Sequence, residues 1–280
     1  MIGKNQWSPQ DQLFTVYFQS YKGYDKIRKR ESGIMNWLQK VLDQKETVTI
    51  DVVGDSITYG LNHCTAEETY VAQFAAMVAR DHPECTVNRY DGMEEDEFSP
   101  MKGFEGPIMI QTGTSGKVIN VIRNGIGGNT VQRALNRIGD FTGMLADGNV
   151  ADITFFMFGI NDALKPDPRK YVSVEQFTEN YKCLLREVRR INGEKKIVLM
   201  SATWNDFAVE EYCEAVKQLA EEEDLPFADQ FAVWKEHYDE NAAHFGQGDW
   251  LSDCSFDACH PTPIGAYQIA RCMYNTFIGI

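Results

Sequence analysis

Short apolar runs and amphipathic stretches alternate along the chain from residue 33 onward. Unbroken apolar runs occupy residues 48–54, 117–124, 151–159 and 195–201, and a weaker run occupies residues 226–231. An unbroken apolar run of this length is typical of a strand in a parallel sheet covered on both faces. The pattern therefore predicts five buried parallel strands.

Helical periodicity lies between the predicted strands. Apolar residues recur at i, i+3, i+4 and i+7 within residues 34–42, 70–78, 177–188 and 209–219. Such a stripe is typical of a helix with one face packed on a core. Strands alternating with helices predict a three-layer α/β domain.

Three local signals predict where helices begin. These signals are Thr65 with Glu68, Ser173 with Gln176, and Thr262 followed by Pro263. The first two have the spacing of a capping box, and the third places a proline at the first position of a helix.

Two regions do not follow the alternation. We expect residues 1–45 to be an N-terminal extension packed on the core, with a helix at about 33–44. Residues 46–280 form the main domain, with an insertion at about 82–116. Within that insertion, residues 86–90 and 107–111 favour a hairpin, and the acidic stretch at 93–100 is typical of a solvated loop.

Composition narrows the possible partners. Twenty-seven basic and 41 acidic residues give a formal net charge of -14, which argues against nucleic acid or an anionic membrane as partner. The N-terminus lacks the features of a signal peptide, so we expect a cytoplasmic protein. Seven cysteines without a CxxC pair fit a reducing compartment and disfavour a disulfide framework.

Four short polar stretches follow predicted strands or precede the last predicted helix. They are "GDSITYG" at 54–60, "NGIGGNT" at 124–130, "GIND" at 159–162 and "DACHPT" at 257–262. Ligands of open α/β sheets bind beyond the carboxyl ends of the strands, so these stretches are candidates for one site.

A serine needs a base, and the base needs an orienting carboxylate, before the serine acts as a nucleophile. Of the five histidines, His260 alone has a carboxylate, Asp257, three residues before it and a helix start just after it. On one tight turn Asp257 can reach Nδ1 and leave Nε2 for Ser56. Asp253 is a second candidate for the acid, but it lies seven residues from His260.

Acyl transfer also needs donors aimed at the developing oxyanion. The backbone N–H groups of Ser56 and Gly128 and the side-chain amide of Asn161 can supply three. A glycine at position 128 lets the backbone approach closely.

These four stretches resemble the blocks of the SGNH hydrolases, the GDSL-type esterases and lipases. The four residues for which that family is named match Ser56, Gly128, Asn161 and His260, and its catalytic acid matches Asp257. The resemblance covers roughly residues 45–280. It implies a flavodoxin-like α/β sandwich with a parallel five-stranded sheet of order 2-1-3-4-5, and hydrolysis through an acyl-enzyme intermediate. It implies no metal and no cofactor.

These residues indicate the type of reaction, but they do not identify the ester that is hydrolysed. We expect a small-molecule or oligosaccharide acyl ester, with a short acyl ester of a carbohydrate first, and a lysophospholipase or acyl thioesterase activity as the alternative. Trp204, Phe245 and Trp250 are candidates for the pocket wall. The oligomeric state stays open.

Two other classes remain as rivals. The glycines at 125, 127 and 128 suggest a dinucleotide-binding loop, but Thr130 stands where its third glycine belongs. Cys254, Cys259 and His260 cluster in sequence, but their spacing matches no common structural zinc site. A catalytically inactive binding domain has no support, because every residue that the chemistry needs is present.

Overall fold

A computed structural model describes residues 37–61, 64–93, 102–138, 150–193, 196–203, 209–236 and 259–279. Its centre is a seven-stranded sheet of order β3-β2-β4-β1-β5-β6-β7. The strands are β1 (Thr47–Gly54), β2 (Thr86–Met93), β3 (Gly103–Gln111), β4 (Val118–Gly125), β5 (Ile153–Met157), β6 (Lys196–Met200) and β7 (Phe227–Ala228).

The predicted α/β class and strand order are confirmed. The five strands expected from apolar runs are β1, β4, β5, β6 and β7, and they lie in the order β4-β1-β5-β6-β7 with parallel pairing throughout. Every residue of β5 is buried, as are seven of the eight residues of β1, which explains their unbroken apolar character.

The predicted number of strands was wrong, because the sheet has two more. β2 and β3 come from the segment expected as an insertion, and their antiparallel pairing confirms the hairpin predicted there, while β2 also lies parallel to β4. Buried and partly exposed residues alternate along most of β2, and β3 at the sheet edge is largely exposed. Neither strand therefore has the apolar run of a central strand.

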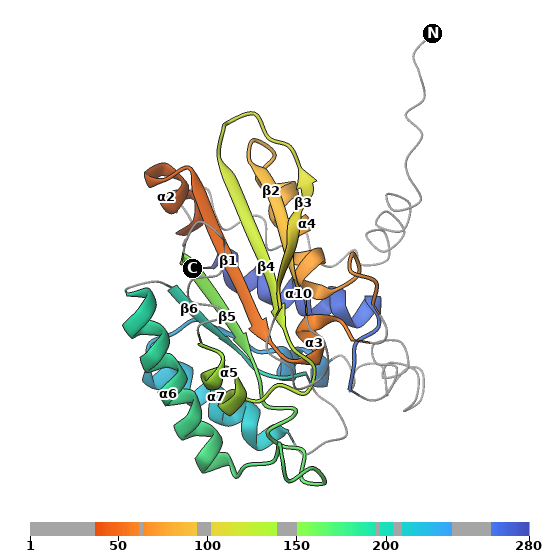
Figure 1. Cartoon of the computed structure of the whole chain (residues 1–280), viewed down its shortest axis with the longest axis vertical. Coiled ribbons are helices and arrows are strands. Elements are labelled where there is room, and N and C mark those ends of the chain that lie inside the picture. Colours follow the sequence, from red (N-terminus) through yellow and green to blue (C-terminus); the bar gives the residue numbers. More distant parts are fainter. Residues whose placement is uncertain are drawn as a thin grey trace. The chain divides into compact units, whose positions relative to one another are not determined.

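Helices cover both faces of the sheet (Figure 1). The helices are α2 (Trp37–Gln44), α3 (Ser56–Tyr59), α4 (Tyr70–Asp81), α5 (Val131–Asn136), α6 (Val174–Asn192), α7 (Glu210–Glu222) and α10 (Pro263–Ile278). α4 packs against α10, whereas α6 packs against both α5 and α7. Residues 1–36 lie outside the described part of the chain, so their packing on the core stays a prediction.

Two adjacent phenylalanines of β5 show how the strand separates the two helical layers. Phe155 packs against Phe74 of α4 and Phe277 of α10, with ring centroids 5.9 and 6.3 Å away. Phe156 stacks on Phe158, which lies edge-on to Tyr181 of α6. Successive side chains of a strand point to opposite faces, so β5 contributes to both halves of the core.

Two of the three predicted helix starts are confirmed. The Ser173 side chain accepts from the N–H of Gln176, and the Thr262 side chain accepts from that of Gly265, with Pro263 following. The start predicted at Thr65 was wrong, because α4 begins after Thr69, whose hydroxyl caps it. The Glu68 carboxylate does accept from the Thr65 N–H at 2.9 Å, but this closes a turn before the helix.

Candidate active site

The candidate nucleophile lies in a tight turn at the carboxyl end of β1. β1 ends at Gly54, and Ser56 is the first residue of the single-turn helix α3. Asp55 is the N-cap of α3, and its carboxylate accepts from the N–H of Ile57 at 2.9 Å. The turn holds Ser56 at a fixed position with 6% of its surface exposed.

Ser56 is hydrogen-bonded to His260. Nε2 of His260 lies 2.9 Å from Oγ of Ser56, although the residues are 204 positions apart in the chain. His260 lies two residues before Thr262, the N-cap of α10, so the docking of α10 brings the imidazole to the carboxyl end of β1. A hydroxyl in contact with an imidazole is the arrangement that a serine nucleophile requires.

Gly128 lies in the loop between β4 and α5, beside the serine turn. Its φ of +66° falls in the left-handed region that favours glycine. Nearby, the backbones of β4 and α3 touch: a Cβ added to Gly125 would lie 2.2 Å from the backbone nitrogen of Tyr59. Gly125, at the end of β4 just before this loop, therefore permits close backbone contact with the helix that carries Ser56.

Asn161 lies in the loop after β5, and its amide is directed at the loop after β4. Nδ2 of Asn161 donates to the backbone oxygen of Asn129 at 3.0 Å, and Nδ2 of Asn129 donates to the backbone oxygen of Gly54 at 3.3 Å. Both asparagines are buried. These bonds join the loops after β5, β4 and β1, so the three segments that hold Asn161, Gly128 and Ser56 are linked.

Asp162 extends this linkage through a buried carboxyl group. Its Oδ1 accepts from the N–H of Val131, the first residue of α5, at 3.2 Å. Burial, together with the charge of Asp55, raises the pKa of Asp162 to about 8. Burial also raises the pKa of Asp55 to about 6, against the hydrogen bond from Ile57 and the attraction of His260.

A further buried polar group lies at the carboxyl ends of β1 and β4. Nδ2 of Asn124 donates to Asp51 at 3.3 Å, and Nη1 of Arg137 donates to Oδ1 of Asn124 at 2.9 Å. Burial raises the pKa of Asp51 to about 7, although Asn124 and Arg137 oppose the change. Sequence reasoning missed this group and Asn129; the available signal was the polar residues inside or just after apolar strands.

Several predicted site residues lie outside the described part of the chain. They are Asp257, Trp204, Phe245 and Trp250, and the alternative acid Asp253 is also among them. The structure thus brings together Ser56, His260 and Asn161 with the Gly128 loop, and the positions of the other residues stay predictions. Among the described residues, no three His, Cys, Asp or Glu side chains cluster as metal ligands would.

The structure disfavours the dinucleotide alternative. α5, which follows the glycine loop, has only six residues, and its first N–H already donates to Asp162. The end of such a helix binds a pyrophosphate through free N–H groups. Gly125, the first of these glycines, instead permits the close contact between the end of β4 and α3.

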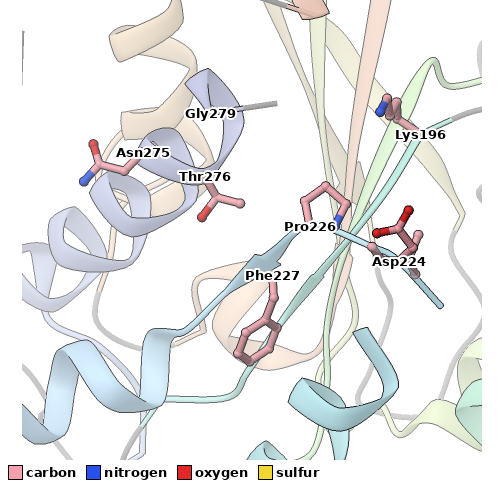
Figure 2. Close-up of a pocket in the computed structure, with 8 residues that line it drawn as sticks. Lys196, Asp224, Pro226, Phe227, Asn275, Thr276 and Gly279 are labelled. Carbon is pink, nitrogen blue, oxygen red and sulfur yellow. The ribbon is translucent and has the colours of Figure 1, made fainter. Parts of the chain in front are cut away.

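A cavity of about 500 Å³ lies away from the serine turn (Figure 2). Its lining includes Lys196 at the start of β6, Pro226 just before β7, and Thr276 near the end of α10. Since all strands from β4 to β7 are parallel, this cavity opens at their amino ends, whereas Ser56 lies at the carboxyl end of β1. The cavity therefore does not belong to the candidate active site.

Comparisons with known proteins agree with this geometry. The model of the GDSL-like Lipase/Acylhydrolase family matches residues 108–267, more than half of the chain. The match includes Gly128, Asn161 and His260, and it begins after the segment that holds Ser56. The chain belongs to this family, a branch of the SGNH hydrolases, and is an enzyme that hydrolyses ester bonds.

Solved structures share the fold at low sequence identity. A variant of Axe2, an acetyl xylan esterase from Geobacillus stearothermophilus, is 20% identical with a TM-score of 0.57, over 82% of this chain and 94% of that chain. LAE5, an enzyme from the metagenome of Lake Arreo in Spain, is 17% identical with a TM-score of 0.57, over 82% and 94%. CEX, a two-domain esterase active on acetylated mannans, is 18% identical with a TM-score of 0.59, over 88% and 53%. No protein of curated function matches the chain.

Within the described residues, no helix combines the length and the apolar character needed to cross a bilayer.

Proposed function

Because the chain is a GDSL-like acylhydrolase, we propose that Ser56 is its nucleophile and His260 its general base. The contact of 2.9 Å between Oγ and Nε2 carries the proposal. Nε2 takes the proton as Oγ attacks the acyl carbon, and it returns that proton to the departing alcohol oxygen. His260 then removes a proton from water, and the resulting attack on the acyl-enzyme releases the acid and restores Ser56.

The oxyanion of each tetrahedral intermediate would lie between the loops after β1, β4 and β5. Its donors are the N–H groups of Ser56 and Gly128 and the amide of Asn161. The bond from Asn161 to the backbone of Asn129 supports this role, because it orients the amide before substrate binds. Donors that need no rearrangement at the moment of reaction stabilise developing charge most effectively.

Asp257 completes the proposed triad by accepting from Nδ1 of His260. Its position three residues before the histidine supports this assignment over Asp253. We expect Asp257→Asn to lower kcat less than replacement of either Ser56 or His260, because the acid orients the base without reacting itself.

For the substrate, we favour a short acyl ester, an acetyl ester first, carried by a carbohydrate. The support is that Axe2 and CEX, which share the fold, act on acetylated xylan and acetylated mannans. Trp204, Phe245 and Trp250 are the aromatic residues proposed for the pocket wall, where a ring can pack on a sugar face.

Ser56→Ala tests the chemical part of the proposal. Hydrolysis of p-nitrophenyl acetate should fall to background while the circular dichroism spectrum stays that of the wild type. Turnover retained by a correctly folded Ser56→Ala protein would remove Ser56 from the mechanism.

A substrate series tests the carbohydrate part. p-Nitrophenyl esters from acetyl to decanoyl should show the highest kcat/KM at acetyl, and acetylated xylo- and manno-oligosaccharides should release acetate. A preference for long acyl chains, without acetate release from either sugar, would contradict the proposal and favour a lysophospholipase or thioesterase.

A further inference from the structure

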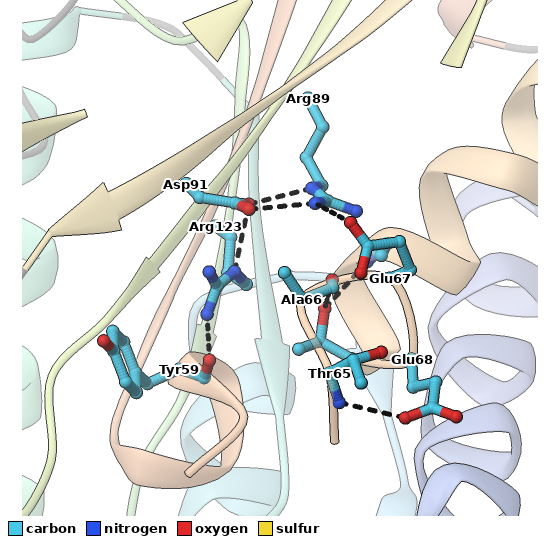
Figure 3. Close-up of polar contacts among 10 residues, drawn as sticks. Tyr59, Thr65, Ala66, Glu67, Glu68, Arg89, Asp91 and Arg123 are labelled. Atoms are coloured by element: carbon cyan, nitrogen blue, oxygen red, sulfur yellow. Dashed lines mark hydrogen bonds and ion pairs between the residues drawn. The ribbon is translucent and has the colours of Figure 1, made fainter. Parts of the chain in front are cut away.

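A buried group of charged residues lies next to Tyr59, the last residue of the helix that begins with Ser56 (Figure 3). It consists of Arg89 and Asp91 on β2 and Arg123 on β4, whose side chains are 2, 6 and 8% exposed. Nε of Arg123 donates to Oδ1 of Asp91 at 3.0 Å, and Nη2 of Arg89 donates to Oδ2 at 2.9 Å. One carboxylate thus holds two guanidinium groups.

The sheet register places these charges together. Asp91 is the direct partner of Arg123 in the pairing of β2 with β4, and Arg89 lies two residues before Asp91 on the same face. On the side of the group that faces solvent, Nη2 of Arg89 lies 3.7 Å from the largely exposed carboxylate of Glu67. Stability alone gives little reason to bury three charges, since well-packed apolar residues often do as well in such places.

Through Arg123, the same group contacts α3. Nη1 of Arg123 donates to the backbone oxygen of Tyr59, and the guanidinium lies over the Tyr59 ring, 5.1 Å from its centroid. Tyr59 is the last residue of α3, and Ser56 is the first. The carbonyls at the end of a helix lack partners within it and attract cations, so Arg123 holds the end of α3 opposite to the nucleophile.

Asp55 and Arg123 therefore fix the two ends of a helix of only four residues. Asp55 caps the start, and Arg123 binds the last carbonyl while its own direction is set by Asp91. A helix of one turn has little stability of its own, so its position depends on such contacts. A small shift of α3 would move Oγ of Ser56 away from Nε2 of His260.

We propose that Arg123 is a positioning residue for Ser56, with Asp91 orienting Arg123 and Arg89 supporting Asp91. The inference rests on the proposed role of Ser56 as nucleophile. In this role the group affects the rate at which Ser56 attacks, and its residues do not contact the substrate.

The test measures the reactivity of the serine directly, with a fluorophosphonate reagent that phosphonylates it. In the reaction, Oγ forms a bond to phosphorus as its proton passes to Nε2 of His260, and the bond from phosphorus to fluorine breaks with fluoride as the leaving group. Arg123→Lys keeps the positive charge but loses the planar fork that joins Asp91 to Tyr59. We expect its second-order rate constant of labelling to fall about tenfold to a hundredfold, since misplacing a reacting group by about 1 Å has an effect of this size.

Two further variants and a control sharpen the result. Asp91→Asn should lower the labelling rate less than Arg123→Lys, and Arg89→Lys should lower it least. Arg189→Lys is the matched control, because Arg189 of α6 pairs at 2.6 Å with Glu223 at the end of α7 and has no part in the contacts of α3. In Arg123→Ala, guanidinium chloride should restore part of the rate where the same concentration of sodium chloride does not.

The outcomes separate this inference from the proposed function. A merely structural role would lower the fraction of protein that is labelled and leave the rate constant of the labelled fraction unchanged, which overturns the proposal. If mass spectrometry finds the label on a residue other than Ser56 in the wild type, the proposed function fails, and this inference fails with it. Should Arg123→Ala not fold, the rate measured for Arg123→Lys decides.

Discussion

The candidate active site and the cavity of Figure 2 lie at opposite ends of the parallel strands, and their polar residues differ in exposure. At the carboxyl ends, Ser56, Asn129, Asn161 and Asp162 are buried and joined by hydrogen bonds between loops. At the amino ends, the cavity of about 500 Å³ is lined by residues such as Lys196 and Asp224, both of which are exposed. The candidate active site is thus distinguished by buried polar groups that join neighbouring loops, and not by an open volume.

The largest loss of activity is expected when the proposed base at the carboxyl ends of the strands is replaced. His260→Ala should lower kcat/KM for p-nitrophenyl acetate by about 10⁴-fold or more, because nucleophile and base act as a unit. His82→Ala is the matched control, since His82 lies after α4 and pairs with Glu84 at 3.5 Å. Activity retained by a folded His260→Ala protein would separate the histidine from the chemistry.

The next largest loss of activity is expected when Asn161, a proposed oxyanion donor, is replaced. Asn161→Ala should lower kcat by about 10²- to 10³-fold with little change in KM, because the lost bond forms in the transition state. Steady-state kinetics on p-nitrophenyl acetate measure the split, with Asn136→Ala on the exposed face of α5 as control. A rise in KM alone would assign Asn161 to substrate binding instead.

A smaller effect is expected for the residue that links the loops. Asn129→Ala removes one of three donors to the Gly54 oxygen, the others being Ile126 and Arg137, and leaves the backbone acceptor of Asn161 in place. We expect kcat to fall about tenfold, which corresponds to about 1.4 kcal/mol of barrier. Steady-state kinetics measure this loss. A loss as large as that of Asn161→Ala would mean that the loop collapses, and circular dichroism would show it.

The buried carboxyl of Asp162 gives a prediction on stability. Its pKa is raised to about 8 in the folded protein from an ordinary value of 3.8, so the folded state keeps a proton that the unfolded state releases. Stability should therefore fall as pH rises from about 4 through about 8. Asp162→Asn keeps an acceptor for Val131 and removes this loss.

Urea unfolding at pH 5 and pH 8.5 measures the effect. The free energy of unfolding of Asp162→Asn relative to wild type should increase between the two values by at least about 1 kcal/mol, given about 1.4 kcal/mol per pKa unit. An equal difference at both values would show that Asp162 is ionised throughout.

The smallest effect is expected at the amino ends. Lys196→Ala and Thr276→Ala change the wall of the cavity in Figure 2 and should leave kcat/KM for acyl esters within about twofold of wild type. A large loss in either variant would show that this end of the sheet contributes to catalysis after all.

Sequence predicted the parts of the fold that follow from unbroken apolar runs and from helix caps. The five parallel strands and the caps at Ser173 and Thr262 are of this kind, because burial on both faces and a side-chain cap each leave a local signal. β2 and β3 lack an unbroken apolar run, since partly exposed strands at the side of a sheet need none, so the sequence indicated them as a hairpin and not as part of the central sheet. The start of α4 was misplaced because Thr65 with Glu68 has the spacing of a capping box, whereas Thr69, which caps the helix, has Ala72 three residues later.

The candidate site was predictable where residue type and spacing carry the chemistry. Ser56 and His260 lie together as expected, although 203 residues separate them in the chain. The groups that hold the site in place were not predictable, because Arg123 and Asp91 become partners only through the register of β2 with β4. A charged residue inside an apolar strand indicates that it has a buried partner, but the sequence alone does not identify which residue that partner is.

The long separation of Ser56 and His260 also has a consequence in time. During translation at about 5–20 residues per second, a ribosome would add His260 roughly 10 to 40 s after Ser56. Because the imidazole reaches the serine only when α10 docks against α4, a nascent chain carries an unactivated hydroxyl through this interval. In the mechanism proposed above, ester hydrolysis would therefore begin only after α10 has docked.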